Sequence, residues 1–600
     1  MNKHSFNGRR SFAFRQWSRK PYAVFSSLRL LIKISVLSVA YTLVNPVQEC
    51  KAQSDSTQVS KIIDLDEVEV SGQRAPEVYS QVARTVTVIT KREVEQAPAQ
   101  SINELLENIP QVDIRQRGTN GVQADISIQG GSFDQTLILL NGFNLSDPQT
   151  GHYNLNLPIN IQSIDRIEVL KGPASRVFGT NAFSGAVNFI TGDNPNNEIS
   201  ASLTAGQYGL YNGAFSVNRK AGRFTNFISL SKSHSDGYIP NTNYNQINAY
   251  YHGNVAFDKS KLHLLFGYNE KQFGANDFYS ARFPDQQEST STWFTGIKFE
   301  TGTNIKLTPS IYWRRNYDHF KILVGNAFSH NYHYSDVYGA NINTVIQNTI
   351  GKMAIGFDYR NEIIYSTNLG KPLAQSDYIT VKGKRGVFYT KNDSRENYSL
   401  FLEQNYLTGN FSASAGVMAN KNSKLDNIEL YPGIDMSYRI FGNSKWFASI
   451  NRSLRLPTFT DLYYQGVQNV GNPDLKPETA WTFETGVKAG FTGMSASLSW
   501  FHRWGKDIID WIWLANEQKW HTENWTTLNT DGIEASVSIN RDLLPSAMRF
   551  IQNIQVSYAF TNISKSTGEF NSYYALDNLK HKLGINVSHN VTKRLSANWN

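Results

Sequence analysis

Cysteine and long apolar runs are both scarce in this chain of 600 residues. Cys50 is the only cysteine, so an internal disulfide and a metal site built from several thiolates are excluded. The mean hydropathy is −0.41. A bundle of membrane-spanning helices needs repeated runs of about 20 apolar residues, so the composition excludes that class too. Aromatic residues are abundant, at 13% of the chain with 30 tyrosines, which is high for a soluble enzyme.

Motifs of the common enzyme classes are also missing. Residues 172–179 (GPASRVFG) begin and end with glycine but lack the Gly-Lys-Ser/Thr of a nucleotide-binding Walker loop. No nucleophile elbow accompanies a Ser-His-Asp order. The sequence therefore predicts no enzyme and no cofactor. Calcium would need several converging oxygen ligands, and the candidate acids lie in different predicted loops: Asp236, Asp277, Asp285, Glu288 and Asp393.

The first 52 residues have a strongly uneven charge. They contain nine basic residues and one acid, Glu49, and a mostly apolar run covers residues 34–44. This pattern predicts an export signal peptide at 1–52. A lone membrane anchor is the alternative, which the short run disfavours. Lipidation of Cys50 is also disfavoured, because Gln48 and Glu49 precede it where small or aliphatic side chains are usual.

Removal of that segment changes the charge balance. Of 58 basic and 50 acidic residues, nine and one lie in the first 52, so 49 of each remain. The sequence pI of about 9.1 therefore reflects the leader. A basic mature domain would indicate nucleic-acid binding, and this balance predicts no such partner.

Residues 53–76 are polar, with one short β-prone stretch at 64–71 (DLDEVEVS). Val68 and Val70 alternate with acids, a pattern that favours an exposed strand. An ordinary first strand of the following domain is the alternative interpretation.

Residues 77–192 mix short strands with a helix. Residues 85–90, 137–140, 167–170 and 186–190 read as strands. Residues 101–110 read as a short helix that Ser101 caps, Glu104 supports in a capping box and Pro110 ends. We expect a compact α+β domain over 77–192.

Residues 193–600 alternate between apolar and polar side chains. Trp481, Phe483, Thr485 and Val487 face one way, and Thr482, Glu484, Gly486 and Lys488 face the other. About 20 such strands predict a transmembrane β-barrel over 193–600. A β-helix or propeller is disfavoured because no fixed repeat is visible. Alternation continues up to Asn600, and we expect about two further strands to complete the barrel.

Several segments resemble TonB-dependent outer-membrane transporters. Residues 165–191 (DRIEVLKGPASRVFGTNAFSGAVNFIT) resemble the end of their plug domain. Residues 453–464 (SLRLPTFTDLYY), 471–478 (GNPDLKPE) and 529–534 (NTDGIE) resemble their late barrel strands. The resemblance implies a transmembrane barrel of about 22 antiparallel strands with an N-terminal α+β plug in its lumen. It also implies a location in the outer membrane and active import.

The resemblance further implies that the stretch near residue 70 is the TonB box, which would add as a strand to TonB. Its residues are Asp66, Glu67, Val68, Glu69, Val70 and Ser71. TonB and its inner-membrane motor proteins would supply the energy. Two departures are visible. Gln129 and Gly130 stand where many members have Arg-Gly, which puts a plug-to-barrel salt bridge there in doubt, and no large domain precedes the box, which argues against the polysaccharide-importing branch.

The plug loop at 141–156 (NGFNLSDPQTGHYNLN) is polar and rich in amides. It most resembles the same loop in vitamin B12 (cobalamin) receptors of the Bacteroides type, so cobalamin is the expected substrate and a surface lipoprotein is an expected partner. A solvated loop without a binding role is the alternative for any one residue. The candidate substrate-binding residues are Asn144, Asp147, Gln149, Thr150, His152 and Tyr153.

Other functions are weighed against cobalamin uptake. Clustered cations would suit an anionic ferric siderophore, and one predicted loop carries Lys382, Lys384, Arg385 and Lys391. An ordinary solvated basic turn is the favoured interpretation of these four residues. Haem could be bound by His152 with His330 or His333, although the latter two would lie on opposite faces of a strand. A passive porin or adhesin and an outer-membrane hydrolase are the more distant alternatives.

Overall fold

The computed structural model describes most of the chain beyond residue 85. The described ranges are 69–70, 77–78, 86–110, 112–192, 196–279, 282–326, 329–565, 571–575, 578–592 and 595–600. The predicted signal peptide lies outside them, as do Asp66, Glu67, Val68 and Ser71 of the predicted TonB box. Its other two residues form β1 (Glu69–Val70), which pairs antiparallel with β2 (Glu77–Val78). In the described residues, no helix is long and apolar enough to cross a membrane.

The N-terminal part is the predicted α+β unit. Its main sheet has the order β3-β8-β9-β6-β7, with β6 and β9 parallel, and a second sheet pairs β4 with β5. The strands are β3 (Val86–Thr90), β4 (Val112–Arg117), β5 (Gln123–Ile128), β6 (Thr136–Leu140), β7 (Phe143–Asn144), β8 (Arg166–Lys171) and β9 (Gly185–Ile190). The helices are α2 (Lys91–Gln96), α3 (Ile102–Glu107) and α4 (Ser175–Phe178), with 3-10 turns η3 (Phe133–Gln135), η4 (Gly151–Tyr153) and η5 (Ile161–Ser163). All five residues of β6 are buried.

Helix α3 begins as predicted but is capped differently. The Ser101 hydroxyl accepts from the Glu104 N–H at 3.3 Å, which satisfies one free donor of the first turn. The Glu104 carboxylate accepts from Gln100 N at 2.8 Å and does not close a capping box with Ser101. The helix ends at Glu107, before Pro110. A complete capping box is formed at the start of α2, by Thr90 and Glu93.

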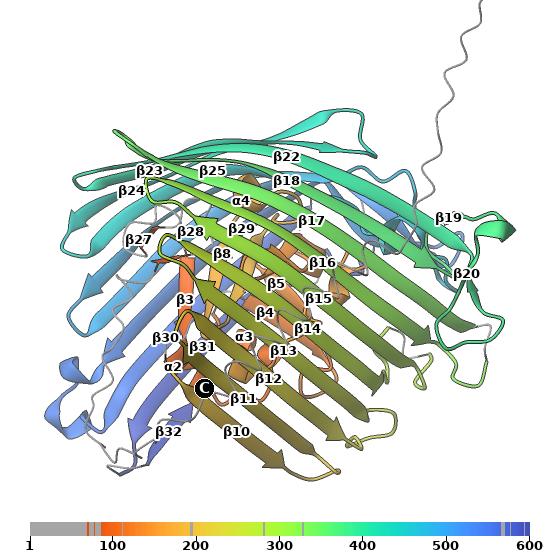
Figure 1. Cartoon of the computed structure of the whole chain (residues 1–600), viewed down its shortest axis with the longest axis horizontal. Helices are drawn as coiled ribbons and strands as arrows, with labels where there is room; N and C mark the ends of the chain where they lie inside the picture. Colours follow the sequence, from red (N-terminus) through yellow and green to blue (C-terminus); the bar gives the residue numbers. More distant parts are fainter. Residues whose placement is uncertain are drawn as a thin grey trace, which may run out of the picture. The chain divides into compact units, whose positions relative to one another are not determined.

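The C-terminal part is one sheet that curves around the plug (Figure 1), antiparallel except for the short parallel pairing of β26 with β29. It has 21 strands in chain order, from β10 to β32 without β20 and β21. They are β10 (Glu198–Ala205), β11 (Tyr211–Ala221), β12 (Phe224–Ser235), β13 (Tyr244–Ala256), β14 (Ser260–Gly274), β15 (Gln287–Thr301), β16 (Ile305–Lys321), β17 (His330–Asn348), β18 (Gly351–Ser366), β19 (Lys371–Pro372), β22 (Lys391–Thr408), β23 (Phe411–Asn422), β24 (Ile428–Phe441), β25 (Ser444–Arg455), β26 (Asn469–Val470), β27 (Glu478–Phe491), β28 (Met494–Leu514), β29 (Lys519–Asn540), β30 (Ile551–Lys565), β31 (His581–Asn590) and β32 (Ser596–Trp599). Among the described pairings, β10 contacts only β11 and β32 only β31.

The alternation predicted for these strands is confirmed by their burial. On β27, Trp481 and Val487 are each 41% exposed, whereas Thr482 and Glu484 are 1% and 4% exposed. The apolar set faces outward, and the polar set faces the plug. This polarity is the reverse of a soluble protein and suits a strand between lipid and a polar lumen.

The two rims of the sheet differ in their connections. One rim has short turns such as residues 302–304 and 442–443, and the other has long segments, including 367–390 and 456–477. The first long segment contains β20 (Ile379–Thr380) and β21 (Phe388–Tyr389), which pair as a hairpin. The second contains α5 (Phe459–Tyr463). We call these the short-turn rim and the long-loop rim.

Candidate functional site

The plug loop at 141–156 starts at a tight turn after β6. Asn141 and Gly142 have φ angles of 51° and 84°, a left-handed conformation that asparagine and glycine adopt most readily. The turn is held to β9 and the segment after it, since Asn188 Oδ1 accepts from Gly142 N at 3.0 Å and Asn141 Nδ2 donates to Thr191 Oγ1 at 2.8 Å. The loop that follows is thus fixed to the plug core.

Asp147 joins this loop to the barrel wall. Arg314 of β16 donates from Nη1 to Asp147 Oδ2 at 2.7 Å, and the two side chains are 1% and 0% exposed. Ser335 of β17 donates to the other carboxylate oxygen at 3.4 Å. A buried pair of this kind costs desolvation energy, so removal of one partner leaves an expensive unpaired charge.

Gln149 and Tyr153 extend the same contact. Gln149 Nε2 donates to Asp318 Oδ2 of β16 at 2.9 Å. Burial, reinforced by the nearby Asp318 and Glu288 carboxylates, raises the pKa of Tyr153 well above its ordinary value. The phenol is therefore a neutral donor that these acids can share.

His152 is engaged within the plug. Its Nδ1 lies 2.5 Å from Asp125 Oδ1, and its ring stacks on Phe133 with centroids 4.2 Å apart. Burial alone would raise the pKa of Asp125, but His152 and Arg117 outweigh it, and the net shift is downward. Thr150 accepts from His152 N at 3.4 Å as the cap of η4.

Asn144 lies at the other end of the candidate set. Its side-chain oxygen accepts from Ser146 N at 3.0 Å, and its backbone oxygen accepts from Arg360 Nη1 at 3.2 Å. All six candidate residues therefore belong to one loop. Asp147, Gln149, Thr150 and Tyr153 are buried, and Asn144 and His152 are partly exposed. Their role in substrate binding stays a prediction.

The short helix α5 closes over this loop, which sequence reasoning did not predict. Phe459 N donates to Pro148 O at 2.9 Å, and Thr460 N donates to Gln149 O at 3.0 Å. A capping box between Thr458 and Asp461 starts the helix. That box was the available sequence signal for a helix here, but nothing in it indicates the plug as partner.

A second set of contacts joins the plug and the barrel through residues outside the loop. Lys171 pairs with Glu534 at 2.6 Å, and Arg176 pairs with Asp435. Arg455 contacts Glu478, Asp461 and the plug residue Asp134 at 2.7, 3.1 and 3.6 Å.

Asp134 is unusual within this set. Burial raises its pKa to about 7, although Arg455 opposes the shift. It also accepts from Gly151 N of the candidate loop at 2.6 Å. Protonation of the Asp134 carboxyl would therefore weaken its ion pair with Arg455 of the wall and alter its hydrogen bond to Gly151 of the loop.

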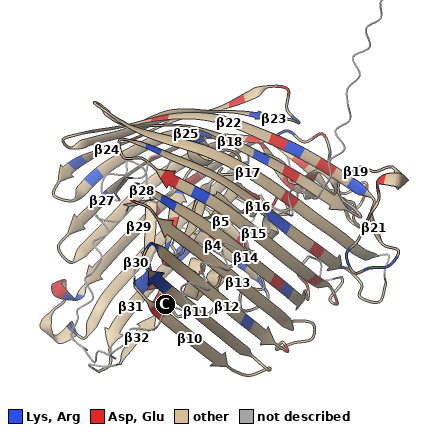
Figure 2. Ribbon diagram, viewed as in Figure 1, with Lys and Arg blue, Asp and Glu red and all other residues tan. Residues whose placement is uncertain are grey.

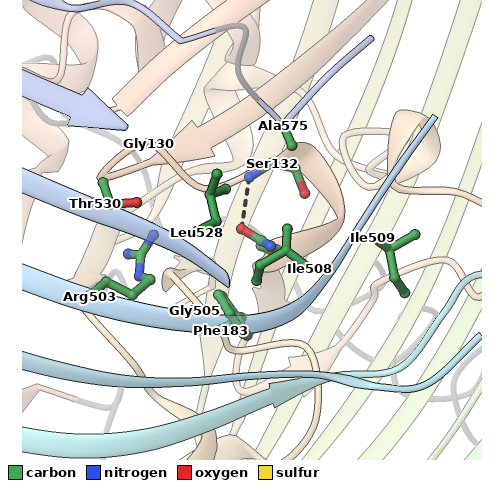
Figure 3. Close-up of a pocket in the computed structure, with 11 residues that line it drawn as sticks. Gly130, Ser132, Phe183, Arg503, Gly505, Ile508, Ile509, Leu528, Thr530 and Ala575 are labelled. Carbon is green, nitrogen blue, oxygen red and sulfur yellow. Dashed lines mark hydrogen bonds between the residues drawn. The ribbon is translucent and has the colours of Figure 1, made fainter. Parts of the chain in front are cut away.

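Gln129, which stands where many family members have arginine, lies beside an arginine of the barrel wall. Arg503 of β28 donates to Gln129 O at 3.3 Å, while its Nε and Nη2 have no hydrogen-bond partner in the described residues. It lines a cavity of about 20 Å³ between the plug and β28 and β29, shared with Gly130, Phe183 and Thr530 (Figure 3). This volume suffices for a water molecule. Other ion pairs, described above, hold the plug to the barrel.

Metal ligation finds little support among the described residues. They include no group of three or more His, Cys, Asp or Glu side chains that could hold a metal ion. His330 and His333 lie three apart on β17, so their rings face opposite sides of the sheet, as predicted. His152 is instead paired with Asp125.

The basic loop lies outside the barrel mouth. Val381 and Tyr389 beside its cations pack with Tyr332 of β17, and Tyr334 and Tyr365 join the same cluster. These tyrosines alternate with the inward-facing Ser335 and Ser366 and therefore face outward. Lys391, by contrast, donates to Asn368 O near the inner edge of the rim. Lys382, Lys384 and Arg385 are exposed, in agreement with a solvated basic turn, and these three residues do not form a cationic cluster at the mouth.

Comparisons with known proteins agree with this architecture. The family model described as the TonB-dependent receptor plug domain matches residues 79–186, and the TonB-dependent receptor-like β-barrel model matches residues 188–600. The chain is therefore a member of the TonB-dependent receptors: a plugged transmembrane β-barrel of the outer membrane that acts in transport and is not an enzyme.

Relatives and solved structures are consistent with that family. The vitamin B12 transporter BtuB of Vibrio vulnificus (strain YJ016) is 24% identical over 528 residues, which is 83% of this chain and 79% of the relative. The siderophore receptor PirA from Pseudomonas aeruginosa has a TM-score of 0.65 at 16% identity, over 86% of this chain and 89% of that one. The copper transporter OprC has a TM-score of 0.71 at 14% identity, over 88% and 84%. The two structures define the fold only.

Proposed function

We propose that this receptor imports cobalamin across the outer membrane. The observation that carries the proposal is the alignment with vitamin B12 transporters over more than four fifths of the chain. The position of Lys382, Lys384 and Arg385 on the outer face adds support, since these three cations do not face the mouth, where they would have favoured an anionic siderophore.

In this proposal, ligand is recognised where α5 meets the plug loop. Tyr463 and Tyr464 at the end of α5 are partly exposed, as are Asn144 and His152 of the loop. Because α5 donates two backbone hydrogen bonds to residues 148 and 149, a ligand that moves α5 also moves the loop. The Asp147 and Gln149 contacts with β16 are then the first plug contacts to change.

The energy-coupling segment is proposed to be Asp66, Glu67, Val68, Glu69, Val70 and Ser71. The Glu69 and Val70 backbone pairs with β2 in this structure. The segment would leave β2 and add to a sheet edge of TonB through main-chain hydrogen bonds. The proposal also includes the predicted limits of the signal peptide, the coupling segment and the plug, which fall after residues 52, 76 and 192. A surface lipoprotein that delivers the ligand is a further proposed partner.

Equilibrium binding separates the substrate proposal from the transport mechanism. Purified receptor is titrated with cyanocobalamin, a ferric siderophore and haem, and we expect saturable binding of cyanocobalamin alone at micromolar concentration or below. Lack of cobalamin binding would overturn the substrate while leaving the family assignment intact.

Deletion of residues 64–72 tests the coupling segment. We expect cells that carry the deletion to bind cobalamin normally and to lose its accumulation. Continued uptake at the wild-type rate would favour a passive pore over TonB-driven transport.

A further inference from the structure

The long-loop rim carries a cationic surface on the outside of the barrel wall. The hairpin of β20 and β21 projects at this rim, beside β19 (Figure 1). Figure 2 shows basic residues on the loop next to β21. We call this surface the rim patch, and it comprises Lys321, Tyr378, Lys382, Lys384, Arg385 and Phe388.

The outward direction of the patch follows from β-strand alternation. On β16, Arg314 and Asp318 contact the plug, so Lys321, three residues beyond Asp318, points to the outer face. Lys382 lies 6.0 Å from the ring centroid of Tyr317, which is also outward. Tyr389 of the hairpin meets the outward Tyr334 edge-on, with centroids 5.0 Å apart. The hairpin is therefore packed on the outer wall.

The charge of the patch is not neutralised by the chain. The segments 319–329 and 366–390 contain one acid, Asp377, against several basic residues. Among the described residues, none of Lys382, Lys384 and Arg385 takes part in an ion pair, and all three are exposed. Lys384 is also close enough to Lys321 and His319 for its charge to act on both.

Apolar side chains lie beside these cations. Tyr378, Ile379 and Phe388 of the hairpin are 37%, 38% and 40% exposed, and Leu323 of the neighbouring loop is 41% exposed. Below them the outer wall carries Trp313, Tyr317 and Tyr334, the residue types that mark the edge of a bilayer. The patch thus joins an apolar surface to positive charge at the level where lipid headgroups begin.

Long connections of bacterial outer-membrane barrels are extracellular. We propose that the rim patch binds the phosphate groups of an anionic glycolipid in the outer leaflet. Its hydrogen-bond donors to phosphate are Lys321, Lys382, Lys384 and Arg385. Tyr378 and Phe388 contact the apolar part of the glycolipid. Clustered lysine and arginine next to a membrane are attracted to anionic headgroups in this way. The site lies outside the lumen and does not depend on the identity of the transported nutrient.

The test uses the full receptor in nanodiscs and labelled lipid A as probe. The rim variant combines Lys382→Glu, Lys384→Glu and Arg385→Glu. A matched control combines Lys220→Glu, Arg223→Glu and Lys259→Glu, exposed cations at the short-turn rim. We expect at least about a tenfold loss of lipid A affinity in the rim variant and none in the control. Dephosphorylated lipid A should bind the wild-type receptor as weakly as phosphorylated lipid A binds the rim variant. Added salt should weaken binding of phosphorylated lipid A to the wild-type receptor.

Equal lipid A affinity in wild type and rim variant would overturn the proposal, as would equal binding of the dephosphorylated probe. A rim variant that keeps lipid A binding but loses cobalamin binding would assign the patch to nutrient capture instead. Heat-modifiable migration on gels checks that each variant is folded. Tyr378→Ser with Phe388→Ser is a second, charge-neutral variant, for which we expect a smaller loss of lipid A affinity that salt does not change.

Discussion

Two neighbouring arginines on β16 show how different the two faces of the barrel wall are. Arg314 faces inward, is 1% exposed and pairs with the plug residue Asp147. Arg315 faces outward with 29% of its side chain exposed, pairs with Asp336 and lies within 6 Å of the ring centroids of three aromatic residues. The inner charge therefore pairs with the plug, whereas the outer charge is neutralised within the wall itself.

Replacement of Arg314 should have the largest effect. In Arg314→Met, Asp147 is left as a buried carboxylate without its cation, and we expect a loss of about 3–5 kcal/mol in the free energy of plug docking. Thermal unfolding and protease cleavage of the plug measure it. Lys220→Met, an exposed control, should change neither. Wild-type protection of the plug in Arg314→Met would show that the pair is dispensable.

A pH dependence should arise at Asp134, also on the inner face. Its folded pKa of about 7 exceeds the ordinary value of 3.8, so the folded state holds the proton more tightly. The stabilisation that this one carboxyl contributes is complete below about pH 4 and is lost as pH rises to about 7, by at most about 4 kcal/mol. Asp134→Asn should remove this part of the pH profile of unfolding. An identical profile in the variant would contradict the assignment.

Close packing at Gly267 should produce an intermediate effect. An ideal Cβ at this inward position of β14 would lie 2.6 Å from Pro158 Cγ of the plug. Gly267→Val should therefore displace the plug and cost about 1–3 kcal/mol. The control is Phe266→Leu, at a neighbouring outward side chain that is 40% exposed. If both variants unfold at the same temperature, the plug does not press on this strand.

The smallest effect is expected on the outer face. Joint replacement Arg315→Met and Asp336→Leu removes both charges together, and we expect a change of about 1 kcal/mol or less. Arg315→Met alone should cost more, because Asp336 is 4% exposed and would lose its cation. Denaturant unfolding of the wild type, Arg315→Met and the double variant measures both changes in the free energy of unfolding. A double variant as unstable as Arg314→Met would remove the contrast between the faces.

Local features of the fold were predictable because they depend on neighbours in sequence. The cap at Ser101, the strand at β6 and the alternation of β27 follow from residue type and spacing. The predicted Ser101–Glu104 capping box was wrong, since Glu104 binds the Gln100 N–H instead. Two equivalent local donors were available to one carboxylate, and the pattern does not choose between them.

The candidate site was predictable only as a loop. Asp147 and Gln149 could be named as polar residues of that loop, but Arg314 and Asp318 lie 167 and 169 residues away in sequence. Contacts over such separations depend on which strand the plug loop meets after folding. The basic loop illustrates the same limit, because its packing on outward tyrosines decided its side of the wall.

The sequence by itself determined the class of this protein, since alternation with period 2 follows from side chains that point to opposite faces of a strand. It also determined the mixed character of the plug, through caps, turns and short apolar runs. Only the tertiary structure decided which charges meet: Asp147 with Arg314, Lys171 with Glu534, and α5 with residues 148 and 149. The physical reason is that burial and pairing of charge depend on distance in space, which a curved sheet of 21 strands sets independently of distance along the chain.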